Sequence, residues 1–156
     1  MSRSGADLAL LLLGGFRLLV DASSSGLASL GFEDFRPVHE FALRAIAAGA
    51  DSASDLGRRT SVSKQAAAKT IAVLRQRGYV EITPDPEDAR RKRLRVTPLG
   101  FEVMAQGEAI LERIRQKWED QIGRAELANL EERLAALVGD AAIRVDAPGW
   151  VAQDPR

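Results

Sequence analysis

Residues 53–66 read ASDLGRRTSVSKQA, and this stretch decides the fold. Ser54 is a suitable N-cap for a short helix, because a serine hydroxyl accepts a hydrogen bond from an unpaired N–H group of the first helical turn. Ser63 is suited in the same way to begin a longer helix over residues 63–77. Two helices separated only by the turn at residues 61–62 predict a helix-turn-helix.

The segments on either side complete a compact lobe at residues 33–99. Upstream, residues 37–48 predict a helix that begins with proline and is followed by glycine. Its expected apolar face consists of Val38, Phe41, Ala42, Ala45 and Ile46. Downstream, residues 79–83 and 93–97 alternate apolar with other residues and predict two strands of a β-hairpin. A helix-turn-helix followed directly by a hairpin is the winged-helix arrangement, so the fold class is mainly α with a small β-hairpin wing.

Apolar helices flank this lobe on both sides. Residues 1–32 contain a predicted helix over 6–22 that is apolar all round, and the serines and glycine at 23–26 are expected to end it. Residues 100–138 are expected to be helical, with apolar residues at helical spacing and a heptad-like leucine seam: Val103, Ile110, Ile114, Trp118, Ile122, Leu127, Leu130, Leu134 and Leu137. A helix that is apolar all round is buried on more than one side, in a small protein often by a second subunit. Residues 139–156 lack periodicity and predict an extended tail.

The composition argues against an enzyme. The 156 residues include no cysteine and one histidine, which excludes disulfides, thiol chemistry and a histidine-based metal site. Neither a phosphate-binding loop nor a G-x-S-x-G motif occurs, so no catalytic residue, metal site or cofactor is expected. The apolar run at residues 8–13 is short of the roughly 20 residues that span a bilayer. We expect a soluble cytoplasmic protein without membrane association, with secretion as the minor alternative.

The formal net charge of zero conceals a strong asymmetry. Taken alone, the balance of 22 basic and 22 acidic residues argues against a nucleic-acid-binding protein, which is usually basic. Residues 58–95, however, contain eleven basic and four acidic residues, a net charge of +7, which leaves −7 for the rest of the chain. The positive segment coincides with the helix-turn-helix and the hairpin, where it could neutralise phosphates.

The second helix of the helix-turn-helix has a polar outward face near its N-terminus. The helical period directs Val62, Ala67, Ile71 and Leu74 inward and leaves Lys64, Gln65, Ala68 and Lys69 outward. Recognition helices contact base edges from this region. Glutamine pairs with adenine and lysine donates to guanine, and small alanines let a helix lie deep in a groove. The alternative is an ordinary surface helix with a polar first turn.

The predicted hairpin loop is the second candidate contact. Residues 85–93 read DPEDARRKR, with four consecutive basic residues at the tip. Asp88 is placed to brace an arginine through a charge-assisted hydrogen bond, and an arginine held in this way can enter a narrow minor groove. There are two alternatives. The basic residues could simply be solvated, or they could form a basic face that binds an acidic protein partner.

These motifs together resemble the MarR-type winged-helix regulators. Residues 53–66 are similar to the family's helix-turn-helix, and Asp88, Arg90 and Arg93 match the D-x-R-x-x-R motif of its wing. Val96-Thr97 with Gly100 is similar to the exit from the wing into a long helix. The sequence departs from the family pattern at Thr60 (usually leucine), Ser61 (usually glycine), Ala68 (often polar) and Ala89 (commonly arginine).

The resemblance implies a homodimer that binds double-stranded DNA and often represses transcription. The N- and C-terminal helices would form the dimer interface, and the DNA-binding residues would be Ser63, Lys64, Gln65, Ala68, Lys69, Asp88, Arg90, Arg91 and Arg93. It also implies release by a small lipophilic or phenolic effector, with His39 and Trp118 as candidate contacts, although such residues on apolar helix faces are more often part of the core. The alternatives are a winged-helix protein-interaction module and a regulator insensitive to ligands.

Overall fold

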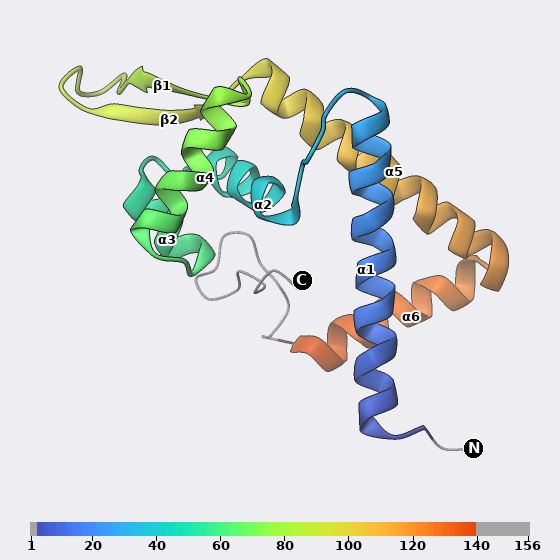
Figure 1. Cartoon of the computed structure of the whole chain (residues 1–156). Coiled ribbons are helices and arrows are strands. Elements are labelled where there is room, and N and C mark those ends of the chain that lie inside the picture. The colour runs from blue at the N-terminus through green and yellow to red at the C-terminus, as the bar shows by residue number, and fades with distance from the viewer. Residues whose placement is uncertain (1–2, 140–156) are drawn as a thin grey trace. The chain divides into compact units, whose positions relative to one another are not determined.

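The computed structural model describes residues 3–139 and confirms the predicted fold class: in this range six helices accompany one antiparallel hairpin (Figure 1). The described residues form two compact units, one of residues 3–35 with 105–132 and one of residues 36–104 with 133–139. The predicted tail lies outside the described residues, apart from Gly139. None of the helices in residues 3–139 combines the length and hydropathy needed to cross a bilayer.

The second unit contains the winged helix. Its elements are α2 (Pro37–Ala47), α3 (Ala53–Thr60), α4 (Lys64–Gln76), β1 (Val80–Pro84), β2 (Lys92–Val96) and the start of α5 (Pro98–Ile122). The strands pair antiparallel, with Val80 opposite Val96 and Pro84 opposite Lys92. The backbone N–H of Leu94 donates to the carbonyl of Asp51, at 3.2 Å, and this ties the hairpin to the segment before α3.

The start of α3 differs from the prediction by two residues. Ser52, and not Ser54, is the N-cap, because Ser52 has an extended backbone and its hydroxyl accepts from the N–H of Asp55 at 3.1 Å. Ser63 is confirmed as the cap of α4, with its hydroxyl accepting from the N–H of Ala66. Between the two helices, Ser61 has a left-handed backbone with φ of +54°, a conformation that favours glycine.

The exit of the wing is held by hydrogen bonds at the start of α5. The Thr97 hydroxyl donates to the carbonyl of Gly78 and accepts from the N–H of Gly100, while the Thr97 N–H donates to the carbonyl of Tyr79. A Cβ on Gly100 would lie 2.3 Å from the Tyr79 carbonyl oxygen, so only glycine allows this approach. The threonine and glycine of the exit motif thus fasten α5 to the end of α4.

The core of the lobe includes most of the predicted apolar face of α2. Ala42, Ala45 and Ile46 are buried as expected, but Val38 is exposed and Leu43, which was not expected inside, is fully buried. The reason is that α2 packs against α3, α4 and β2 together, so its buried surface is wider than a single amphipathic stripe.

The first unit contains α1 (Gly5–Ser29), and here the predicted helix end is wrong. The helix continues through residues 23–26 to Ser29, whose hydroxyl donates to the Ser25 carbonyl within the helix. A Cβ on Gly26 would lie 2.7 Å from the Cδ1 atom of Ile110 on α5. The glycine therefore permits close helix packing and does not terminate the helix, which ends before Gly31 at φ of +92°.

The C-terminal helical segment is divided into two helices. Gly123, at φ of +94°, separates α5 from α6 (Arg124–Val138). The Arg115 guanidinium forms two hydrogen bonds with Glu131, at 2.7 and 3.0 Å, and so holds α5 and α6 together. On α6, Leu127 is buried, whereas Leu130, Leu134 and Leu137 of the predicted seam are exposed.

Candidate nucleic-acid interface

The N-terminal half of α4 presents its polar side chains to solvent. Lys64, Gln65, Ala68 and Lys69 are exposed, whereas Ala67, Ile71 and Leu74 are buried and Val62 is half-buried. Within the part of the chain that the structure describes, Lys64, Gln65 and Lys69 form no hydrogen bond or ion pair with the protein. Their donors are therefore free to bind another molecule. The exposed Ser63 is occupied as the helix cap.

The tip of the hairpin is shaped by two aspartates through backbone amides. The Asp88 carboxylate accepts from the backbone N–H of Arg90 at 3.0 Å, and the Asp85 carboxylate accepts from that of Glu87 at 2.9 Å. The N–H of Asp85 also closes the loop by donating to the carbonyl of Arg91 at 2.8 Å. The expected bond between Asp88 and an arginine side chain is absent among the described residues. Asp88 thus fixes the backbone of Arg90, as short aspartate side chains commonly do in turns.

The arginines of the wing remain exposed. Arg90, Arg91 and Arg93 are all exposed, and within residues 3–139 none of the three has an intramolecular ion pair. Arg93 lies opposite Thr83 in the sheet, and Arg95 lies opposite Glu81. Since alternate residues of a strand share a face, Arg93 and Arg95 extend the same face of the hairpin away from buried Leu94 and Val96.

Two arginines of α3 have a partner inside the lobe. Arg58 and Arg59 bind the carboxylate of Asp55, at 3.0 and 3.1 Å, and Arg59 also donates to the carbonyl of Ala48. Burial alone would raise the pKa of Asp55, but the hydrogen bonds from the two arginines outweigh it and hold the pKa below its ordinary value. These cations help to fix α3, so the free positive charge lies chiefly on α4 and the wing.

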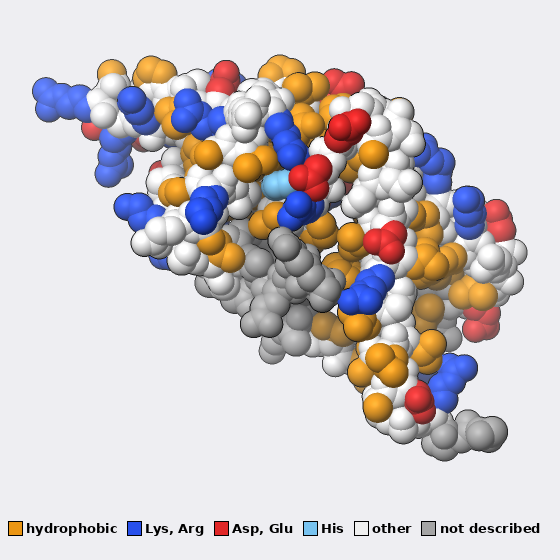
Figure 2. Space-filling model, viewed as in Figure 1, with side chains coloured by type: hydrophobic (Ala, Val, Ile, Leu, Met, Phe, Trp, Pro, Cys, Tyr) orange, Lys and Arg blue, Asp and Glu red, His pale blue; other side chains and the backbone are white. Residues whose placement is uncertain are grey.

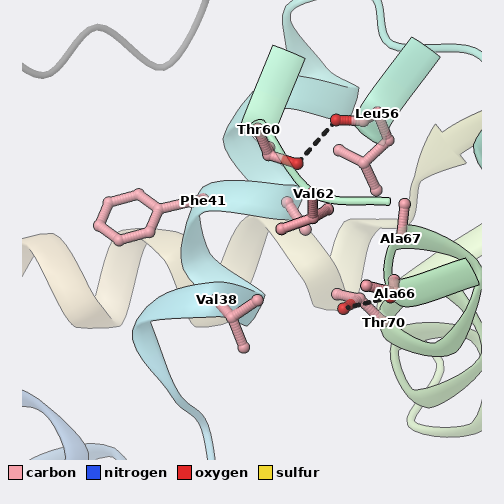
Figure 3. Close-up of a pocket in the computed structure, with 9 residues that line it drawn as sticks. Val38, Phe41, Leu56, Thr60, Val62, Ala66, Ala67 and Thr70 are labelled. Atoms are coloured by element: carbon pink, nitrogen blue, oxygen red, sulfur yellow. Dashed lines mark hydrogen bonds between the residues drawn. The ribbon is translucent and has the colours of Figure 1, made fainter. Parts of the chain in front are cut away.

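A small apolar pocket lies beneath the helix-turn-helix (Figure 3). Its volume is about 50 Å³ and it is lined from α2, α3, the turn and α4 by Val38, Phe41, Ala42, Leu56, Thr60, Val62, Ala66, Ala67 and Thr70. The Thr60 hydroxyl donates to the Leu56 carbonyl at 2.7 Å, and the Thr70 hydroxyl donates to the Ala66 carbonyl at 3.2 Å. Both hydroxyls return to their own helices, so the pocket has an apolar lining.

The two candidate effector contacts lie in different units. His39 is buried in the first turn of α2, where its Nδ1 atom accepts from the backbone N–H of Arg36 at 3.0 Å. This bond satisfies one of the amides at the start of the helix, so His39 has a structural role. Trp118 is half-buried on α5.

Known proteins are similar to the lobe in sequence and to the chain in fold. Residues 38–91 match the sequence model of the MarR family. This part of the lobe is therefore similar in sequence to the MarR family. The HTH-type transcriptional regulator BilQ of Clostridioides difficile (strain CD3) is 35% identical over 71 residues, which cover 46% of this chain and 45% of BilQ. The chain therefore matches slightly less than half the length of that curated relative.

Solved structures extend the likeness beyond the lobe to most of the chain. S. aureus MepR F27L bound to an oligodeoxyribonucleotide has a TM-score of 0.59 and 14% identity, over 84% of this chain and 95% of that one. CouR of Rhodococcus jostii RHA1 bound to p-coumaroyl-CoA has a TM-score of 0.62 and 17% identity, over 92% of this chain and 100% of that one. At these identities the likeness establishes the fold alone.

Sequence reasoning did not assign a role to two backbone features of the lobe. Asp85 shapes the wing loop together with Asp88, and its position directly before a proline is a typical turn signal. The left-handed backbone of Ser61 follows from the tight turn, because its N–H and that of Val62 both donate to the carbonyl of Gly57. Only the family's usual glycine at that position pointed to this conformation.

Proposed function

We propose that the protein is a sequence-specific regulator of transcription, and specifically a repressor, that binds double-stranded DNA as a homodimer on a pseudo-palindromic operator. The observation that carries the proposal is the free positive charge of the lobe. Lysine and arginine side chains gather over the wing and the helix-turn-helix (Figure 2), and those of Lys64, Lys69, Arg90, Arg91 and Arg93 are exposed.

In this proposal α4 lies in the major groove and the wing reaches the adjacent minor groove. Lys64, Gln65 and Lys69 are at the end of the helix from which recognition helices contact base edges, and the N-terminal end of the helix dipole also favours phosphate. Arg90 is the principal minor-groove residue and Arg91 a weaker candidate. Asp88 positions Arg90 through the backbone, so the aspartate leaves the guanidinium free for DNA.

The first experiment measures fluorescence anisotropy of the full chain on a random duplex over a series of salt concentrations. Arg90→Ala should weaken binding and reduce the salt slope by about 0.9 for each phosphate that the arginine neutralises. Arg113→Ala, which removes an exposed arginine from α5, is the matched control and should change neither. No binding to the duplex even at low salt would favour the alternative of an acidic protein partner.

The second experiment separates recognition of sequence from general affinity. Gln65→Ala should change the preferred sequence in selection from a randomised duplex pool, because glutamine pairs with adenine through two hydrogen bonds. Its affinity for random duplex should remain close to that of the unchanged protein. Equal losses on selected and random duplexes would refute the assignment of Gln65.

The homodimer is supported by exposed leucines on two helices. Leu8, Leu10, Leu11 and Leu12 of α1 are each at least half exposed, and Leu137 of α6 is 85% exposed. So much exposed apolar surface is typical of an interface. Leu11→Asp should shift the chain to a monomer in sedimentation equilibrium and weaken operator binding, whereas Leu99→Asp, at an exposed leucine of the lobe, should leave the dimer intact. A dimer that survives Leu11→Asp would argue against α1 as the interface.

Control by a small lipophilic or phenolic effector is supported by the fold it shares with CouR, which binds p-coumaroyl-CoA. An effector should lower operator affinity in the anisotropy assay, and Trp118→Phe should change the concentration required. Deleting the gene should raise expression of a reporter under the selected operator, as expected of a repressor. Operator affinity that no phenolic or acyl-thioester compound changes would favour the ligand-insensitive regulator.

A further inference from the structure

The outward face of α4 combines two polar side chains with bare methyl groups. Ala68 and Ala72 are exposed and lie one helical turn apart. The row formed by Gln65 and Lys69 lies beside them on the same side of the helix, since residues three and four apart are neighbours on a helix surface. Alanine suits any exposed helix position because of its high helix propensity, but on a surface that reads bases its methyl group is also available for an apolar contact.

Ala68 is the alanine closest to the region that meets base edges. It is in the second turn of α4, four residues after Lys64 and three after Gln65, whereas Ala72 lies a further turn from the N-terminus. The only methyl group that an unmodified base pair presents in the major groove is the thymine C5-methyl, and alanine is one of the side chains that contact it. Gln65 supplies the complementary group, because glutamine binds the adenine edge.

We propose that Ala68 is a specificity-determining residue that reads the methyl group of a thymine in each operator half-site. The inference rests on the proposed function and adds a chemical identity to the DNA sequence that α4 prefers. The half-site has an A·T pair in the reach of Gln65 and a thymine methyl packed on Ala68. A polar side chain at this position, as is frequent in the family, would lack this apolar contact.

The test uses the full chain and removes one methyl group at a time from the DNA. An operator is first selected from a randomised duplex pool, and each of its thymines is then replaced by deoxyuridine, which lacks only the C5-methyl and keeps every hydrogen-bonding group. At one position of each half-site the replacement should weaken binding about fourfold, the factor expected for one buried methyl group. The remaining positions should show no change.

Variants of the two alanines assign the effect to a residue. Ala68→Gly should bind the thymine and deoxyuridine operators equally at the sensitive position. Ala72→Gly is the matched control, because it removes the same exposed methyl from the same helix at a similar cost to helix stability. It should retain the fourfold discrimination.

The outcomes separate this inference from the proposed function. Tight operator binding that no deoxyuridine replacement weakens would overturn the role of Ala68 and leave the DNA-binding regulator intact. Discrimination that persists in Ala68→Gly, or disappears equally in Ala72→Gly, would also overturn it. Failure to bind any duplex would overturn both.

Discussion

Replacing Thr60 with leucine should stabilise the lobe by filling the pocket beneath the helix-turn-helix. Thr60 is 5% exposed and lines this pocket of about 50 Å³ (Figure 3). Leucine, the family's usual residue here, is larger than threonine and entirely apolar. At ~24 cal/mol per Å³ of cavity, filling a space of this size is worth about 1.2 kcal/mol.

The hydroxyl removed in Thr60→Leu offsets only part of this gain. Its partner is the Leu56 carbonyl at 2.7 Å, which is four residues earlier and therefore also the helical acceptor for the Thr60 N–H. The carbonyl keeps the N–H donor, so the substitution leaves no buried polar group without a partner. A large loss of stability is expected only when such a group is left unpaired. We expect a net increase of roughly 1 kcal/mol in the free energy of unfolding.

The assay is urea unfolding followed by circular dichroism, with every variant at one protein concentration, since the stability of a dimer depends on concentration. Thr60→Leu should raise the midpoint without changing the m-value. Thr60→Val is the matched control for the hydroxyl, because it removes the oxygen with little change in size and should have a smaller effect. A lower midpoint for Thr60→Leu would show that the pocket cannot accept the side chain and would refute the reasoning.

Three further substitutions test the local geometry by the same unfolding assay. Ser61→Gly should raise stability by up to about 1 kcal/mol, because it relieves a left-handed backbone at φ of +54°; a decrease would show that the hydroxyl matters more than the backbone. Gly100→Ala should destabilise by about 1–3 kcal/mol through overpacking against the Tyr79 carbonyl, whereas Gly14→Ala, with nothing within 4 Å, should not. Asp55→Asn should destabilise at neutral pH. The pKa of Asp55 is lower in the folded protein. Its contribution to the free energy of unfolding is therefore complete above the unfolded pKa of about 3.9 and is lost as the pH falls through the folded pKa. If the stability difference between Asp55→Asn and the parent stayed constant down to the folded pKa, the role of the arginines would be contradicted.

The parts of the fold that the sequence predicted are those set by local rules. Ser63 caps α4 because its hydroxyl needs only an amide three residues away, and the inward positions of Ala67 and Leu74 follow from the helical period. The start of α3 was misplaced because Ser52 and Ser54 are equally good caps in the sequence. The choice depends on where the chain becomes extended after α2, and that is a property of the packed lobe.

The predictions that failed depend on contacts between distant residues. Gly26 carries the signal of a helix end, but its neighbour is Ile110, 84 positions later in the chain, and no local pattern contains that contact. Asp88 was expected to hold an arginine side chain because it lies in a basic run. The loop closure between Asp85 and Arg91 instead brings the amide of Arg90 to the carboxylate. For the candidate site, the sequence identified which side chains point outward but not which atoms hold the wing.

The zero net charge of the chain is the sum of a region with unpaired cations and regions in which charges are paired. Outside α4 and the wing, several carboxylates pair with nearby cations, as in Glu40 with Arg44, Glu131 with Arg115 and Glu119 with Arg124. On α4 and the wing, the described lysines and arginines lack such partners. Acidic residues elsewhere therefore balance the total without pairing with the cations of this surface. The potential that an approaching polyanion meets is set by the unpaired cations of the lobe, and the formal net charge is a poor guide to it.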